Sequence, residues 1–238
     1  MTTGAVLIVA AACGGGGGEV VDVYAASSLT DAYGAVAEGF EAEHPDYEVR
    51  LNLAGSATLQ RQILDGAEAD VFAPADIALL GPFIEGVIDE PPPQPYARNT
   101  LTLVVADGAD GADGVVDSLD DLAAPGVLVA RCASGVPCGD AADAVLAAAG
   151  VVPDRATEEP NVRSVLTKVA RGEVDAGLVY VTDAAGHDGV TEIPLTDAPE
   201  VLYAVLALTD EPGAAAFVDY VQSPAAARLL AERGFVIP

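Results

Sequence analysis

The chain has very few basic residues, a single lysine and no tryptophan. Its 238 residues contain 10 Lys and Arg against 37 Asp and Glu, which gives a formal net charge of −27, and Lys168 is the one lysine. So few cations cannot form a basic patch that neutralises a phosphate backbone, which excludes nucleic acid as a partner. The acidity favours a well-solvated, soluble surface over one made for a cationic ligand.

The N-terminal segment predicts where the protein is located. The apolar run Ala5–Ala12 is too short to span a bilayer and matches the hydrophobic region of a secretory signal. Cys13 follows directly, and then Gly14–Gly18. This order is similar to a bacterial lipoprotein signal, in which the cysteine is acylated and the glycines form a flexible tether. We therefore expect an extracytoplasmic protein that is lipid-anchored to the cell membrane through Cys13. The alternative is a buried N-terminal strand containing a core cysteine.

Cysteine is scarce elsewhere, since Cys132 and Cys138 are the only others. The segment ASGVP between them does not give the spacing of a zinc site or of a thioredoxin-type pair. In an exported protein, two nearby cysteines favour a small disulfide loop. Two independent buried thiols are the alternative.

Strand-like and helix-like patterns alternate from Glu19 onward. Helical stripes of apolar residues occupy 29–44 and 162–169, and Gly172 ends the second stripe. Short segments rich in Val and Leu, bounded by Gly, Pro or Asp, predict the strands VVDVYA, EVRLNLA, DVFAPA, TLTLVVA, GVLVARC, AGLVYVT and VLYAVLAL. This alternation predicts an α/β fold with helices covering the sheets.

The positions of the prolines predict two lobes. Prolines precede the predicted strands Thr100–Ala106 and Val201–Leu208, which we interpret as two crossings between the lobes. On this interpretation residues 1–18 are signal and tether, 19–97 with 205–238 form the first lobe, and 98–204 form the second.

Four predicted strand-to-helix junctions could bind an anion. We predict that Ser28 is an N-cap, with Asp31 three residues later in an arrangement like a capping box. Asn161 is a second predicted N-cap, and a helix is predicted to begin at Ser56. Arg163 is the one cation near them, and we expect it to orient a loop. Helix starts that follow strand ends lie along one sheet edge, so two facing lobes would direct their free N–H groups into one cleft. The four junctions are Ala25–Asp31 (AASSLTD), Ala54–Thr58 (AGSAT), Val136–Asp140 (VPCGD) and Pro160–Arg163 (PNVR).

The segments around these junctions resemble the extracytoplasmic molybdate-binding proteins of molybdate ABC transporters. The resemblance runs in order from about Val20 to Pro238. It implies the two-lobed α/β fold of a type II periplasmic binding protein, with the ligand in the inter-lobe cleft. The matching segments are AASSLTDAYGAVAEGFE, GSATLQRQILDGAEADVFAPAD, ARNTLTLVV, VPCG, NVRSVLTKVARGEVDAGLVYVTDA and YVQSPAAARLLAERGF.

The resemblance also implies a set of ligand-binding residues. Ser28 and Ser56 take the positions of the ligand serines and should offer hydroxyl groups. Cys138 replaces the alanine of the family's Val-Pro-Ala-Gly and should offer its backbone N–H, as should Val162. Tyr180 should offer its phenolic hydroxyl. Molybdenum would be held through these oxyanion-binding residues only.

The implied function is a monomeric solute-binding lipoprotein that captures molybdate, and also tungstate, without a cofactor and without catalysis. It would deliver the anion to the permease and ATPase of an ABC importer. One alternative is a binding protein for another oxyanion, such as sulfate, thiosulfate or phosphate. A secreted serine hydrolase using Ser28 would need a base that the sequence does not supply, and a structural or adhesive lipoprotein would not need four aligned helix starts.

Overall fold

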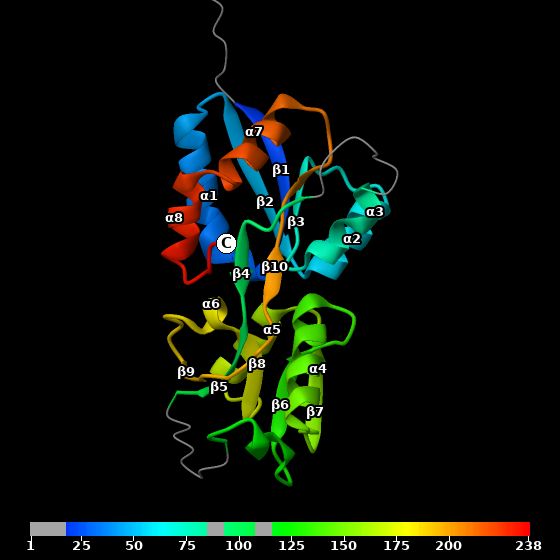
Figure 1. The fold of residues 1–238 in the computed structure, drawn as a ribbon, viewed down its shortest axis with the longest axis vertical. Coiled ribbons are helices and arrows are strands. Elements are labelled where there is room, and N and C mark those ends of the chain that lie inside the picture. Colours follow the sequence, from blue (N-terminus) through cyan, green and yellow to red (C-terminus); the bar gives the residue numbers. More distant parts are fainter. Residues whose placement is uncertain (1–17, 85–92, 108–115) are drawn as a thin grey trace, which may run out of the picture.

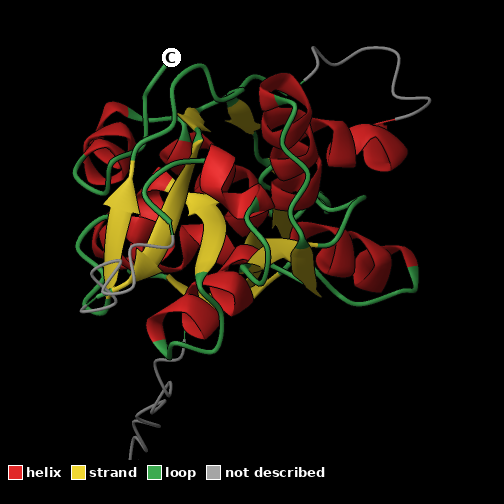
Figure 2. Ribbon diagram, turned by 90° about the horizontal axis from the view of Figure 1, so that it is seen from below, coloured by secondary structure: helices red, strands yellow, loops and turns green. Residues whose placement is uncertain are grey.

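The computed structural model describes residues 18–84, 93–107 and 116–238. Cys13 and almost all of the predicted signal and tether lie outside these residues. The described chain forms two α/β lobes, one above the other in Figure 1, and helices pack around the strands (Figure 2). The predicted α/β class and two-lobed architecture are confirmed.

The first lobe is built on a four-stranded sheet of order β11-β3-β1-β2. The strand β1 pairs in parallel with β2 and β3, whereas β11 pairs antiparallel with β3. Aromatic side chains of α1 and α7, Tyr33, Phe40 and Phe217, lie fully buried in its core. The strands are β1 (Glu19–Ala26), β2 (Tyr47–Ala54), β3 (Val71–Ala73) and β11 (Leu206–Ala207). The helices are η1 (Ser27–Leu29), α1 (Thr30–Glu43), α2 (Ser56–Leu64), η2 (Ile77–Leu80), α3 (Gly81–Ile84), α7 (Pro212–Val221) and α8 (Pro224–Ala231).

The second lobe is built on a five-stranded sheet of order β7-β6-β8-β5-β9. The strand β6 pairs in parallel with β7 and β8, and β5 pairs antiparallel with β8 and β9. The strands are β5 (Leu101–Ala106), β6 (Leu128–Cys132), β7 (Arg155–Glu159), β8 (Ala176–Tyr180) and β9 (Val190–Ile193). The helices are η3 (Asp120–Ala123), α4 (Pro137–Ala149), α5 (Val162–Ala170) and α6 (Val181–Ala184).

Two short strands connect the lobes. β4 (Ala97–Asn99) and β10 (Val201–Tyr203) pair antiparallel and run side by side from one lobe to the other (Figure 1). The prediction that Thr100–Ala106 forms a crossing is wrong, because β5 is almost entirely buried and lies inside the second-lobe sheet. The predicted strand Val201–Leu208 is split, since its first part crosses between lobes and its end, β11, joins the first-lobe sheet.

The two edge strands of the second lobe had no clear sequence signal. The strand β7 has the sequence RATEE, and Glu159 is its one buried residue. The strand β9 is short, with its two middle residues exposed. An edge strand has a hydrogen-bonding neighbour on one side only and tolerates charge, so its apolar pattern is weak.

Candidate anion-binding site

The lobes meet around a small cavity of about 20 Å³. All five predicted site residues line it: Ser28, Ser56, Cys138, Val162 and Tyr180. The other lining residues are Ala26, Ser27, Gly55, Ala75, Val136, Pro137, Pro160 and Asn161. A space of this size admits one small group rather than an organic substrate. A larger hollow of about 940 Å³, on the first lobe, contains none of the predicted residues.

The Ser56 hydroxyl is prepared to donate a hydrogen bond. Its Oγ accepts the backbone N–H of Ala75 at 3.0 Å, and Ser56 is buried. Since that oxygen is already used as an acceptor, its own proton remains for a ligand in the cavity. Ser56 is the first residue of α2 but does not cap it, because Gly55 occupies the N-cap position.

The Ser28 hydroxyl belongs to a buried pair with a tyrosine from the connecting strands. Ser28 Oγ lies 2.9 Å from Tyr203 Oη, and either group can donate. When Tyr203 donates, the Ser28 proton is left for the cavity. The predicted N-cap role of Ser28 is wrong, since Ser28 lies within η1 and α1 begins at Thr30 without a side-chain cap. The 3₁₀ turn carries the Ser28 side chain inward toward Tyr203 instead.

Tyr180 places a phenolic hydroxyl in the cavity lining. Its side chain is 1% exposed, and its Oη has no hydrogen-bond partner among the described residues. Burial, followed by the nearby Tyr203 and Asp183, raises the pKa of Tyr180 well above its usual value, so the hydroxyl stays protonated at neutral pH. A buried unpaired hydroxyl is costly, and an anion in the cavity would satisfy it.

Two helices of the second lobe direct their N-termini at the same cavity. The backbone N–H groups of Cys138 in α4 and Val162 in α5 have no acceptor in the described part of the chain. Such groups carry the positive end of the helix dipole and favour an anion. Asn161 caps α5 as predicted, with its Oδ1 accepting the Ser164 N–H at 3.0 Å.

A disulfide holds the first turn of α4 in place. The structure joins Cys132 at the end of β6 to Cys138 in the first turn of α4, as the sequence favoured. Both cysteines are buried. The bond ties the residue whose N–H faces the cavity to the rigid sheet behind it.

The described residues that line this cavity carry no charge. Arg163 does not line it, because its guanidinium is engaged by Asp31 and Asp183. The cavity lining also contains no histidine or carboxylate that could activate Ser28 or Ser56 as a nucleophile. The arrangement can therefore bind an anion through neutral donors, and it lacks the parts of a hydrolase.

Sequence reasoning missed three residues of this site. Tyr203 and Ala75 orient the two serines from distant parts of the chain, so no local spacing could reveal them. Ser27 lines the cavity beside Ser28. The adjacent pair Ser27-Ser28 was visible in the sequence, but the 3₁₀ turn that brings both residues to the lining was not.

Comparison with known proteins agrees with this geometry. The model of the family "bacterial extracellular solute-binding protein" matches residues 21–236. The molybdate-binding protein ModA of Mycobacterium tuberculosis is 37% identical over 222 residues, covering 91% of this chain and 84% of that protein. The periplasmic molybdate-binding protein of Azotobacter vinelandii has a TM-score of 0.76 at 22% identity, covering 92% of this chain and 99% of that one. The sulfate-binding protein SubI of Mycobacterium tuberculosis also has a TM-score of 0.76, at 17% identity, covering 92% and 87%.

The fold and the cavity define a two-lobed binding protein for a small solute. The chain belongs to the family of bacterial extracellular solute-binding proteins. It is accordingly a component of transport rather than an enzyme, and its family is extracytoplasmic. In the part of the chain that the structure describes, no helix has the length and apolar character to cross a membrane.

Proposed function

We propose that this protein captures molybdate between its two lobes and delivers it to an ABC importer. The observation that carries the proposal is the buried Tyr180 hydroxyl, which has no partner among the residues that the structure describes and lies in a small uncharged cavity with free N–H groups and serine hydroxyls around it. The 37%-identical relative, which is named for molybdate binding, supports the choice of anion.

Neutral donors suit this ligand. Molybdate is fully deprotonated at neutral pH, so it offers only acceptors, and each donor of the cavity can face an oxygen. A hydrogen-bond acceptor of the protein in contact with the ligand would instead repel the dianion. Tungstate has the same charge and shape, and we propose that it binds as well. Sulfate also has this charge, so selection against it would rest on the size of the cavity.

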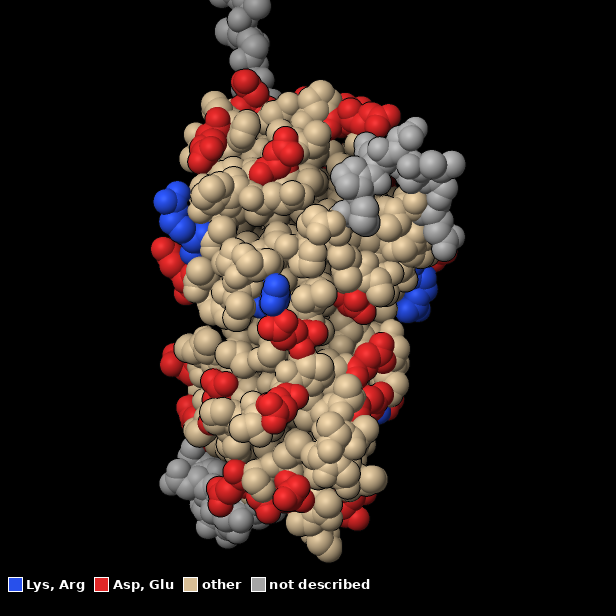
Figure 3. All heavy atoms as spheres, in the orientation of Figure 1, with Lys and Arg blue, Asp and Glu red and all other residues tan. Residues whose placement is uncertain are grey.

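The strongly acidic surface opposes an anionic ligand at long range. Acidic side chains are spread over both lobes, and basic ones are few (Figure 3). Repulsion between solvent-exposed charges is largely screened beyond about 8 Å at physiological salt. The donors of the cavity act at contact distance, so capture is slowed at low salt more than affinity is reduced.

The remaining parts of the proposal concern the assembly. We propose that Cys13 carries the lipid anchor, that the partners are an ABC permease and its ATPase, and that the protein works as a monomer without a cofactor. Residues 19–97 with 205–238 would form one lobe, and residues 98–204 would move against them as the other.

A second candidate is a binding protein for another oxyanion. The sulfate-binding SubI and the Azotobacter molybdate-binding protein have equal TM-scores, so the fold alone does not choose between the anions. The identity of the sequence relative favours molybdate over sulfate, thiosulfate and phosphate.

Calorimetry with a panel of anions tests the proposal. Molybdate and tungstate should bind tightly and raise the melting temperature, because a ligand that binds only the folded state stabilises it. Sulfate, thiosulfate and phosphate at the same concentration should leave the melting temperature unchanged. Equal stabilisation by sulfate would overturn the choice of molybdate, and no response to any of these anions would overturn the anion site.

A further inference from the structure

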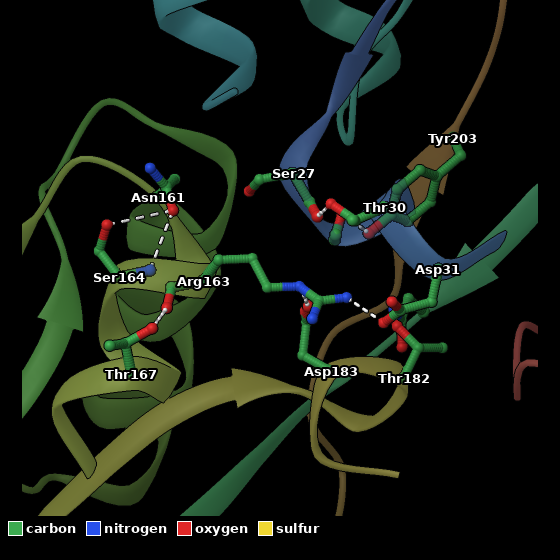
Figure 4. Close-up of polar contacts among 12 residues, drawn as sticks. Ser27, Thr30, Asp31, Asn161, Arg163, Ser164, Thr167, Thr182, Asp183 and Tyr203 are labelled. Atoms are coloured by element: carbon green, nitrogen blue, oxygen red, sulfur yellow. Dashed lines mark hydrogen bonds and ion pairs between the residues drawn. The ribbon is translucent and has the colours of Figure 1, made fainter. Parts of the chain in front are cut away.

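The guanidinium of Arg163 connects the two lobes beside the anion cavity. Arg163, the second residue of α5, donates from Nη2 to Oδ2 of Asp31, which lies in the first turn of α1 in the other lobe. Its Nε lies 2.8 Å from Oδ1 of Asp183, in α6 of its own lobe. Figure 4 shows the Arg163 side chain extended between these two carboxylates.

The two ion pairs differ in burial. The Asp183 side chain is 0% exposed, whereas that of Asp31 is 62% exposed and that of Arg163 is 27% exposed. When Asp183 is ionised, breaking the inner pair would leave a buried carboxylate without its cation, which is strongly unfavourable. The outer pair is exposed and therefore weak. Arg163 is thus held by Asp183 within the second lobe, and its bond to Asp31 is the one that can open.

Each member of this bridge is close in sequence to a residue of the cavity. Arg163 follows Val162, Asp31 comes three residues after Ser28, and Asp183 comes three residues after Tyr180. None of the three bridge residues lines the cavity itself. The bridge therefore acts on the position of the segments that carry the ligand donors and does not contact the anion.

We propose that Arg163 is a positioning residue that latches the two lobes over the bound anion. Held in place by Asp183, it reaches Asp31 when the lobes are together and loses Asp31 when they separate. The latch slows the release of the anion and favours the closed arrangement. The identity of the anion rests on the proposed function, but the latch itself does not.

The first test measures anion release from the full-length chain. Asp31→Asn should raise the dissociation rate of molybdate by about two- to fivefold, the range expected for an exposed ion pair. Arg163→Lys keeps the charge beside Asp183 but cannot bridge both carboxylates, so it should have the same effect. The double variant should be no faster than either single variant, because both changes remove one interaction.

A matched control separates the latch from a general loss of charge. Asp22 forms an exposed ion pair with Arg50 within the first lobe, at 3.2 Å. Asp22→Asn therefore removes the same charge without touching the inter-lobe bridge, and its dissociation rate should equal that of the wild type. At about 1 M salt the difference between Asp31→Asn and wild type should disappear. Equal release rates for Asp31→Asn and Asp22→Asn would overturn the proposal.

A second measurement does not depend on which anion binds. Spin labels at two exposed positions, Leu64 in the first lobe and Val152 in the second, would report the inter-lobe distance by pulsed electron resonance. Asp31→Asn should increase the long-distance population in the unliganded protein, and Asp22→Asn should not. If molybdate fails to bind but Asp31→Asn still increases the long-distance population, the latch is supported and the proposed ligand is wrong. If molybdate binds and neither rate nor distance changes in Asp31→Asn, the latch falls and the proposed function stands.

Discussion

Gly55 lies against the carbonyl oxygen of Pro160 across the cleft, so closely that a Cβ on Gly55 would stand 2.6 Å from that oxygen. Gly55 has φ −60° and ψ 131°, a conformation open to any residue. Glycine is therefore required here by the approach of the second lobe and not by the backbone of the first.

Gly55→Ala should obstruct the closed arrangement. The added methyl meets a backbone carbonyl that cannot rotate away, and overpacking of this kind costs about 1–3 kcal/mol. We expect molybdate affinity to fall by roughly ten- to a hundredfold, while the unliganded protein melts at or above the wild-type temperature. Titration calorimetry measures the affinity for molybdate, and a thermal melt of the same sample measures the melting temperature. Gly34→Ala is the control, since a Cβ added at this position of α1 would meet no neighbouring atom of the described residues within 4 Å, and it should leave affinity unchanged. Unchanged affinity in Gly55→Ala would contradict this account of closure.

Ser28→Ala and Ser56→Ala should each weaken molybdate binding by roughly ten- to a hundredfold. Each removes a hydroxyl donor to a buried dianion, and a hydrogen bond to a charged group contributes about 1.5–3 kcal/mol. Titration calorimetry gives the affinity, and denaturant unfolding gives the stability. Ser223→Ala is the matched control: Ser223 caps α8 by accepting the Ala226 N–H, so it should lose about 0.5–2 kcal/mol of stability with its affinity intact. Intact affinity in both cavity variants would defeat the assignment of these serines.

Tyr180→Phe should reduce affinity without reducing stability. The hydroxyl has no partner among the described residues, so its removal from the unliganded protein relieves an unsatisfied polar group. The expected result is weaker molybdate binding together with an equal or higher melting temperature of the unliganded protein. A loss of stability with unchanged affinity would mean that the hydroxyl serves the fold instead.

The disulfide between Cys132 and Cys138 should stabilise the first turn of α4. In the chain-entropy description, removing a disulfide that closes so short a loop lowers the free energy of unfolding by about 2 kcal/mol. The double variant Cys132→Ala, Cys138→Ala should therefore melt lower and bind molybdate more weakly, because the Cys138 N–H is no longer held toward the cavity. Intact mass after alkylation checks the bond itself. Two alkylated thiols in exported, non-reduced protein would refute it.

Asp183 should make the stability of the fold depend on pH. Burial raises the pKa of its carboxyl to about 7, although Arg163 opposes this and Asp31 adds to it. An unfolded aspartate titrates near pH 4, so between about pH 4 and 7 the folded chain holds a proton that the unfolded chain lacks. The contribution of Asp183 to the free energy of unfolding therefore falls as pH rises through this window, by up to about 1.4 kcal/mol per pH unit.

Denaturant unfolding of wild type and Asp183→Asn between about pH 5 and about pH 8 measures this effect. The free energy of unfolding of the wild type minus that of the variant should decrease as pH rises, because the variant has no proton to lose at this position. A difference that stays constant across the range would show that Asp183 is ionised throughout.

The local organisation of this protein could be predicted from its sequence. The stripe ending at Gly172 predicted α5, and the Asn161 cap and the nearby cysteine pair were also predicted. Each depends on residues a few positions apart, whose geometry the backbone repeat determines. The five ligand positions came from the resemblance to a family, and the structure brings them to one cavity.

Tertiary structure decided what those residues do. Ser28 was expected to cap a helix, but its hydroxyl pairs with Tyr203, 175 residues away. Ser56 is oriented by Ala75, and Arg163 joins two lobes that no sequence pattern relates. Helix starts follow from neighbours along the chain, whereas the direction of a buried hydroxyl or guanidinium follows from whichever distant group satisfies it. Packing of the two lobes supplies those groups, and for that reason the structure was needed to find them.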